Sequence, residues 1–171
     1  IPFRGSWVDF TTDIYDCIYA IIDRRRKFPA TLLLRAIGYS SNKDIFEVFN
    51  LVKEYKISNA KNLVGKEFLE DIVIKKSGEV LAEQGQTITK KDLETLAEAG
   101  IKIIPAVKDV EDLDYQMLQN TVEKDPTNNS GEALMLLYEH LRSGKAPNVP
   151  VAQKFIEKMF FSSKKYDLGQ V

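Results

Sequence analysis

The sequence predicts an α+β fold of mixed strands and helices, with a small ββαβ unit inserted between two flanking segments. Alternating β-branched and aromatic residues near the N-terminus indicate strands, and apolar residues at helical spacing dominate the last third. The middle of the chain carries strand, turn and helix signals of its own. With 171 residues, 44% of them hydrophobic, the chain can fill a core without disulfides or metals.

The chain begins with a predicted pair of strands and a helix. Residues 6–10 and 15–23 are rich in strand-forming types, and residues 11–13 join them. A helix is expected over 29–37, because a proline suits its first turn and Gly38 suits the left-handed position after its end.

A second helix is predicted after Ser41. Its hydroxyl can accept from the backbone amide of Asp44, whose carboxylate can reciprocate, and this capping box favours a helix from residue 42 to about residue 52. We take residues 1–55 as the first flank.

Residues 56–124 are the predicted inserted subdomain with a connecting helix. Thr89 and Asp92 form a capping-box-like pair, and Ile88 and Leu93 can pack across it. The expected elements are a strand at 66–74, a tight turn at 76–79, a strand at 80–82, a helix that Gly100 ends, a strand at 101–104, and the connecting helix at 110–123.

The second flank, residues 125–171, opens with a breaker cluster at 125–129 and then predicts two helices. Asn148 can cap the second of them, with Pro150 in its first turn. The stripe of the first helix is Leu134, Leu137, Tyr138 and Leu141, with Gly144 after its end; that of the second is Val151, Phe155 and Met159, flanked by Ala152, Ile156 and Phe160.

Composition excludes several classes of protein. One cysteine and one histidine cannot supply the four ligands of a structural zinc site, and a single cysteine cannot form an internal disulfide. No apolar stretch approaches the length of a membrane span, and no signal peptide is recognisable. We therefore expect a soluble cytoplasmic protein without membrane contact. Because the first residue is Ile rather than Met and the last segment stops without a cap or a polar tail, we also expect a piece cut from a longer chain.

The chemistry of a stand-alone enzyme is not evident. His140 has no serine or cysteine nucleophile at a recognisable spacing, so a solvated residue is the preferred interpretation. Cys17 lies in a strand pattern and is expected to be a small buried hydrophobe. The pairs 70–71 and 111–112 are possible metal ligands, although adjacent acids usually form a solvated face.

Two features point toward nucleic acid. Four consecutive cations at 24–27 follow a strand and can contact phosphates, although such a run is often only a solvated turn. Trp7, the only tryptophan, follows an Arg-Gly-Ser run and suits stacking on an unpaired base, although a tryptophan on a strand is more often part of the core. Spacing alone leaves both alternatives open. By charge, the flanks are slightly basic and the middle is acidic.

These residues resemble the lobe region of the bacterial RNA polymerase beta subunit. The similarity covers the two flanks, about 90 residues, and the middle looks like the lineage-variable insertion of that family. It is carried by the runs at 1–7, 22–31, 33–39, 125–128, 141–144, 160–162 and 166–168.

The resemblance implies a non-catalytic fragment of a multisubunit DNA-directed RNA polymerase, a nucleotidyltransferase. The lobe would form one wall of the downstream DNA channel beside the non-template strand. No cofactor is expected in the fragment, since the catalytic magnesium belongs to the beta-prime subunit. The implied partners are downstream duplex and non-template DNA, the beta-prime and alpha subunits and sigma factor, in a nucleoid-associated cytoplasmic enzyme; the fragment alone is expected to be a monomer.

The family places specific residues against DNA. Trp7 would stack on a non-template base, and Arg142 and Lys165 would face that strand, Lys165 standing where arginine is more usual. Asp23 is expected to orient a neighbouring arginine. The DNA-binding residues expected on this basis are Arg4, Trp7, Asp23, Arg24, Arg25, Arg142 and Lys165.

A protein-interaction module is the alternative function. In that case the inserted unit or an apolar helix face would dock an initiation factor or a transcription regulator.

Overall fold

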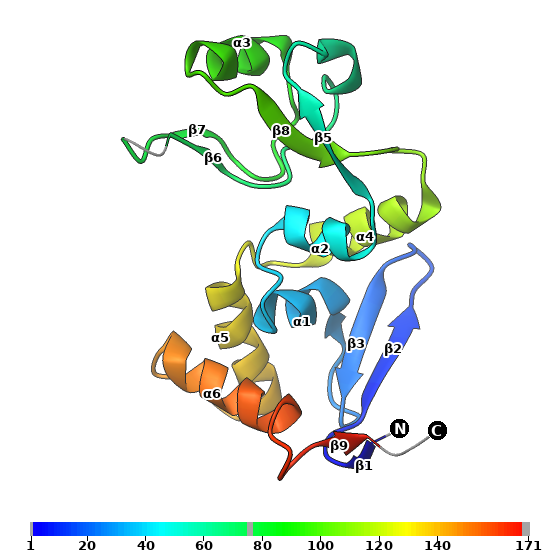
Figure 1. The fold of residues 1–171 in the computed structure, drawn as a ribbon. Helices are drawn as coiled ribbons and strands as arrows, with labels where there is room; N and C mark the ends of the chain where they lie inside the picture. Colours follow the sequence, from blue (N-terminus) through cyan, green and yellow to red (C-terminus); the bar gives the residue numbers. More distant parts are fainter. Residues whose placement is uncertain (1, 75–76, 169–171) are drawn as a thin grey trace. The chain divides into compact units, whose positions relative to one another are not determined.

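The computed structural model describes residues 2–74 and 77–168, and it has a mixed α+β fold (Figure 1). Its contacts divide the chain into two compact units. Unit 1 is Ile1–Ser40 with Met117–Val171, and unit 2 is Ser41–Gln116. The sequence-based division placed residues 41–55 with the first flank; by contacts they belong to unit 2. That unit 2 is an insertion that varies between lineages stays a prediction.

The described residues of unit 1 form two small sheets and three helices, together with most of a fourth helix, α4, which begins in unit 2. Its elements are β1 (Pro2–Arg4), β2 (Val8–Thr12), β3 (Ile18–Ile22), β4 (Phe28–Pro29), α1 (Ala30–Ala36), α4 (Leu113–Lys124), α5 (Ser130–Leu141), α6 (Val149–Phe160) and β9 (Asp167–Leu168). Strands β2, β3 and β4 form one antiparallel sheet, and β1 pairs with β9. The predicted hairpin and the helices around it are confirmed, with their ends shifted by a few residues.

The core of unit 1 lies between the β2–β3–β4 sheet and the helices α1, α5 and α6 (Figure 1). The leucine stripe predicted on α5 is buried. On α6 the predicted stripe is confirmed only in part, since Phe155 and Met159 are half-buried against the core. Val151 is 39% exposed, whereas the flanking Ala152 and Ile156 are at most 1% exposed, so the buried face is turned by about one residue.

A buried polar network ties α1 to the segment before α5. The Arg35 Nε lies 3.4 Å from Oδ2 of Asp125, and both side chains are almost completely buried. Asp125 also accepts from the hydroxyl of Thr31 at 2.7 Å and from the hydroxyl and backbone amide of Thr127 at 2.6 and 2.9 Å. The breaker cluster therefore does more than end a helix, because its first residue neutralises a charge inside unit 1.

Unit 2 has its own core beneath α3, and its elements are shown in Figure 1. They are α2 (Asn42–Val48), β5 (Val52–Lys56), a short 3₁₀ helix (Ala60–Asn62), β6 (Ile72–Val73), β7 (Val80–Ala82), α3 (Lys90–Glu98), β8 (Ile103–Val107) and the start of α4. Both predicted capping boxes are present, at Ser41 and at Thr89.

The order of unit 2 includes the predicted ββαβ succession, but its pairing differs from the expectation. The long strand predicted at 66–74 is wrong, since only β6 forms there and pairs with β7. The last strand, β8, pairs instead with β5, a strand for which the sequence contains no prediction, and the helix expected to reach residue 52 ends at Val48. Asn50, at φ +57°, lies beyond the end of α2 and leads into β5. The predicted turn at 76–79 lies partly outside the described residues.

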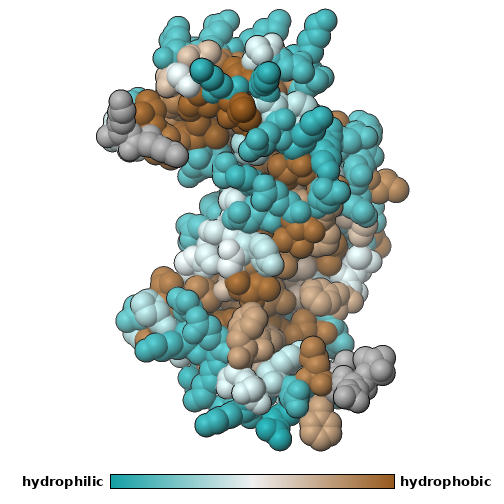
Figure 2. All heavy atoms as spheres, viewed as in Figure 1, coloured by the Kyte–Doolittle hydropathy of each residue, from teal (hydrophilic) through white to brown (hydrophobic). Residues whose placement is uncertain are grey.

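Apolar side chains reach the surface of unit 1 around strands β1 and β9 (Figure 2). Phe3 is 78% exposed and Leu168 is 64% exposed.

Candidate nucleic-acid interface

Trp7 lies at the surface of unit 1, beside a pocket of about 410 Å³. The side chain is 49% exposed, and Asp9, Asp23 and Arg24 line the pocket with it. A half-exposed indole keeps one part packed and leaves another part accessible to a flat ligand. The core alternative for Trp7 is therefore wrong for this chain.

The turn after β3 positions the residues next to Trp7. Asp23 and Arg24 both have positive φ, at +50° and +58°, and the amide of Arg25 donates to the carbonyl of Ile22 at 3.0 Å, as in a type I′ turn. This left-handed backbone directs Asp23 and Arg24 to the same pocket as the indole.

Asp23 holds the backbone of Trp7 rather than an arginine. Its Oδ1 accepts from the amide of Trp7 at 2.9 Å, and its own amide donates to the carbonyl of Trp7 at 3.0 Å. Within the described residues, no ion pair joins Asp23 to an arginine within 4.0 Å. The expectation that Asp23 orients a neighbouring arginine is therefore corrected: it fixes the strand that carries the indole.

The four consecutive cations have different neighbours. Arg24 faces the Trp7 pocket, and Arg25 donates from Nη1 to the carbonyl of Leu141 at 2.7 Å, at the end of α5. That contact is favourable because a helix C-terminus carries partial negative charge. Arg26 lies close enough to His140 to affect its pKa. Lys27 places its Nζ 4.3 Å from the centre of the Tyr19 ring.

Arg142 lies over an aromatic platform at the end of α5. Its guanidinium carbon is 5.3 Å from the centre of the Phe155 ring and 5.9 Å from that of Tyr138. The two rings are themselves in edge contact at 5.2 Å. Its Nη1 also donates to the hydroxyl of Tyr138 at 3.5 Å, and the side chain is otherwise exposed, so the rings restrain the guanidinium at the surface.

Arg25 and Arg142 line the same polar pocket, of about 530 Å³, together with Lys145. Sequence reasoning had not selected Lys145. Its place one residue after Gly144, in the loop that follows Arg142, is the only sequence signal that favours it. Arg24 in the Trp7 pocket and Arg25 in this cationic pocket are consecutive residues.

Arg4 and Lys165 form a separate basic group where β1 meets the C-terminal segment. Arg4 donates from Nη1 to the carbonyl of Lys164 at 3.3 Å, and Lys165 is exposed. Gly5, at φ +115°, allows this approach, because a Cβ at that position would lie 2.6 Å from Cδ2 of Tyr166. The glycine of the Arg-Gly-Ser-Trp run is thus required by packing.

His140 is half-buried, so its interpretation as a solvated residue is wrong. Its ring stacks on Phe28, with centroids 5.6 Å apart. Burial, and then the charge of Arg26, lowers the pKa of His140 below its usual value. Cys17 is buried, as predicted, and burial raises the pKa of its thiol.

Three of the four carboxylates in the pairs 70–71 and 111–112 have structural partners. Glu70 lies 3.4 Å from the Nζ of Lys43, and Asp71 accepts from the amide of Gln84 at 2.8 Å. Asp112 accepts from the amides of Asp114 and Tyr115 at the start of α4. Across residues 2–74 and 77–168, no group of three histidine, cysteine, aspartate or glutamate side chains is arranged to hold a metal ion.

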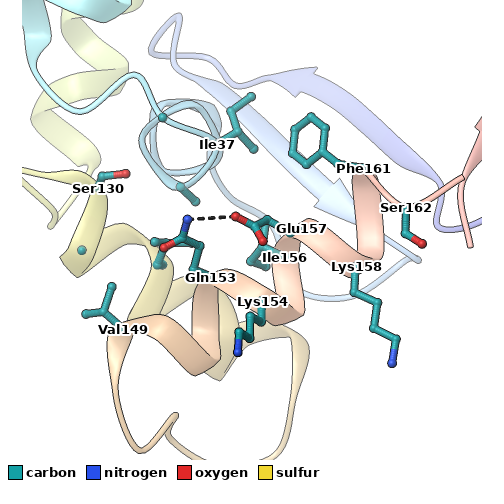
Figure 3. A pocket seen from close by; sticks show the side chains of 14 residues that line it. Ile37, Ser130, Val149, Gln153, Lys154, Ile156, Glu157, Lys158, Phe161 and Ser162 are labelled. Carbon is teal, nitrogen blue, oxygen red and sulfur yellow. Dashed lines mark hydrogen bonds between the residues drawn. The ribbon is translucent and has the colours of Figure 1, made fainter.

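Figure 3 shows a larger groove of about 830 Å³ that lies between the end of α1, the start of α5 and helix α6. Ile37 and Phe161 lie on one side of it, and the side chains of Lys154 and Lys158 extend away from them. Gln153 donates to Oε1 of Glu157 at 2.8 Å. None of the predicted DNA-binding residues lines this groove, and its lining offers no nucleophile with an adjacent base.

The charge is divided unequally between the units. All six arginines lie in unit 1, which has 13 basic and 10 acidic residues, whereas unit 2 has 11 lysines and 15 acidic residues. Arginine is the side chain best suited to paired contacts with phosphates and bases. Any polyanion is therefore expected to meet unit 1.

Comparison with known proteins agrees with the resemblance seen in the sequence. The family described as "RNA polymerase Rpb2, domain 2" matches residues 1–104. Proteins named DNA-directed RNA polymerase subunit beta from Cytophaga hutchinsonii, Flavobacterium psychrophilum and Bacteroides fragilis are 40%, 39% and 37% identical to the whole of this chain. The chain spans 15% of the length of each of these relatives. In the part of the chain that the structure describes, every helix is too short or too polar to cross a bilayer.

Proposed function

Because this chain belongs to the family described as RNA polymerase Rpb2, domain 2, we propose that it is a non-catalytic segment of the beta subunit of a bacterial DNA-directed RNA polymerase. In this role it forms a wall of the downstream DNA channel and guides the displaced non-template strand. Its partners in the whole enzyme are DNA, the beta-prime and alpha subunits and sigma factor. Bond formation takes place elsewhere in that enzyme, at a magnesium ion that the beta-prime subunit holds.

The observation that carries this proposal is the half-exposed indole of Trp7 beside an open pocket. An unpaired base is flat and has a π-face, and stacking on an aromatic side chain is worth roughly 1–3 kcal/mol per base. Asp23 fixes the backbone of Trp7 through two hydrogen bonds, so the residue that carries the indole is held in place before a base binds.

Cations of unit 1 supply the contacts to phosphates. Arg24 lines the pocket of Trp7, while Arg25 and Arg142 line the cationic pocket. Arg4 and Lys165 lie at the β1–β9 end of unit 1. Phosphate contacts of this kind carry no sequence information, so any base preference comes from the stacking position.

The sole tryptophan provides a direct test of the proposal. Titration of the 171-residue chain with short single-stranded oligodeoxynucleotides at low salt is expected to quench the fluorescence of Trp7. Replacement of Trp7 by alanine is expected to weaken binding by about 5- to 150-fold, the equivalent of roughly 1–3 kcal/mol. Anisotropy of a labelled oligonucleotide measures the variant, which has no tryptophan.

Phe10→Ala is the matched control. Phe10 lies on β2, is 63% exposed and does not line the Trp7 pocket, so its removal should leave the affinity within twofold. Equal losses for both variants, or quenching that does not depend on the oligonucleotide, would contradict stacking at Trp7. In the complete polymerase, Trp7→Ala should change the preference for start sites or pause sites at particular non-template bases, while the rate of bond formation is unchanged.

A further inference from the structure

Unit 2 contains an apolar groove of about 750 Å³ that the proposed DNA contact does not use. It runs between one face of α3 and the adjoining ends of β5 and β8, which are labelled in Figure 1. Its apolar lining comes from Ile57, Ala60, Leu93, Ala97, Ile101 and Ile103.

The backbone fixes both walls of this groove. Lys90, Leu93, Glu94 and Ala97 follow one another at helical spacing, so they share one face of α3. Gly100, at φ +82°, then turns the chain toward β8. The amide of Ile101 donates to the carbonyl of Leu96 at 3.0 Å. On the strand side of the groove, the amide of Ile57 donates to the carbonyl of Lys102 at 2.9 Å. The groove is therefore preformed.

The groove leaves apolar surface open to solvent. Ile103, the first residue of β8, is 50% exposed, and Ala97 on the facing helix is also exposed. Beneath them, Leu93 and Ile57 are buried and form the floor. A concave apolar surface of this kind fits one or two apolar side chains of a ligand.

The rim of the groove is positively charged within a negatively charged unit. Lys56, Lys90 and Lys102 line it against a single acid, Glu94, although unit 2 as a whole has four more acids than lysines. All three lysines are exposed, and among the described residues none of them has a carboxylate within 4.0 Å. The cations are thus available to a ligand.

The same residues disfavour other ligands. The lining contains no arginine and no aromatic side chain, so it offers neither a guanidinium for paired contacts with phosphates nor a ring on which a base could stack. It also contains no histidine or cysteine. An apolar floor with a lysine rim is instead complementary to a protein segment that has apolar side chains on one face and carboxylates beside them.

We propose that this groove docks an acidic amphipathic segment of a partner protein. Two or three apolar side chains of the segment occupy the floor between α3 and β8, and its carboxylates lie against Lys56, Lys90 and Lys102. The proposal is independent of DNA binding, because the groove and the Trp7 pocket have no residue in common.

The test uses the 171-residue chain and a pair of synthetic peptides. One is a 14-residue helical peptide with leucines along one face and glutamates flanking them; the other is identical except that lysines replace the glutamates. The glutamate peptide is expected to bind at least tenfold more tightly, measured by anisotropy. Amide signals of Ala97, Ile101 and Ile103 should shift in NMR spectra of the labelled chain.

Charge reversal at the rim distinguishes docking from general attraction. Lys90→Glu and Lys102→Glu are each expected to weaken binding of the glutamate peptide at least fivefold. Lys91→Glu is the matched control: it makes the same charge change one residue along α3, outside the lining, and should change affinity by less than twofold. Ala97→Phe, which fills the groove without changing charge, should also reduce binding.

Each of the following results would overturn the proposal: equal affinity for the two peptides, an effect of Lys91→Glu as large as that of Lys90→Glu, or NMR shifts that lie outside the groove. Displacement of the peptide by a single-stranded oligonucleotide would assign the groove to nucleic acid instead. Circular dichroism of each variant verifies that it is folded, and Trp7 fluorescence titrations report the proposed DNA function separately.

Discussion

Asp23 shows how a single residue can take a role that its sequence context does not indicate. Next to four cations, a carboxylate is expected to pair with an arginine, yet here it accepts the amide of Trp7. The contact depends on a turn with two left-handed residues; Asp23 is a residue type that such turns favour, but Arg24 is not, so the sequence signal for the turn is weak. The sequence could select Trp7 as a candidate, but only the fold decides that its ring is half-exposed.

Gly5→Ala is expected to destabilise unit 1 by about 1–3 kcal/mol, because the added methyl group meets the Tyr166 ring and the backbone at φ +115° disfavours a side chain. Thermal unfolding measures the change. Gly38→Ala is the matched control: its φ is also positive, at +126°, but nothing lies within 4 Å of the added Cβ. A loss at Gly5 no larger than that at Gly38 would show that the close approach is not required.

His140 is expected to make stability depend on pH. Its folded pKa is lowered, so between that value and the unfolded pKa of about 6.5 the unfolded chain binds more protons than the folded chain. Stability from this residue is therefore complete above about pH 6.5 and decreases as the pH falls below it. His140→Phe keeps a ring on Phe28 without a titrating group. When the pH is lowered from about 7.5 to 5.5, the thermal midpoint of the His140→Phe variant should fall less than that of the wild type. If the two midpoints fall in parallel with pH, His140 does not have this role.

At the scale of elements, the sequence predicts helix starts that depend on neighbouring residues, but not strand pairs whose members are far apart in the sequence. The helices α2 and α3 begin at capping boxes whose residues are three positions apart, so the sequence contains the whole signal. Strand β5 depends on β8, about 50 residues later, and neither strand has strict alternation. The same holds for β1 with β9, which pair across almost the whole chain.

The buried network around Asp125 is expected to stabilise the junction of α1 and α5. Asp125→Ala removes the carboxylate beside buried Arg35 and the acceptor for Thr31 and Thr127, and a loss of about 3–5 kcal/mol is expected from chemical denaturation. Asp125→Asn keeps an acceptor oxygen and should lose less. If both variants lost the same small amount, the network would not be a major source of stability.

At the scale of the whole chain, the separation of arginines from acidic residues supports a division of labour between the units. The net charge of −1 conceals an excess of three basic residues in unit 1 and of four acidic residues in unit 2. The block counts along the sequence indicated this tendency. Its assignment to two contact-defined units required the fold, because both segments of unit 1 had to be brought together.

This division predicts which cations determine the salt dependence of DNA binding. For single strands, the logarithm of affinity falls with the logarithm of salt concentration with a slope of about −0.7 per phosphate neutralised. Arg142→Gln should therefore reduce the slope by about 0.7, whereas Lys61→Gln in unit 2 should leave it unchanged. Oligonucleotide titrations at several salt concentrations measure the slope for each variant. An equal reduction of the slope for Lys61→Gln would contradict the assignment of the DNA contact to unit 1.

The left-handed turn at Arg24 has a practical consequence for genetics. At most surface positions, a substitution that removes a charge either leaves the backbone strain unchanged or increases it. Here glycine or asparagine would relax the main chain at φ +58° while deleting the guanidinium. A defect in DNA handling seen with such a substitution would therefore be attributed to the lost guanidinium rather than to backbone strain.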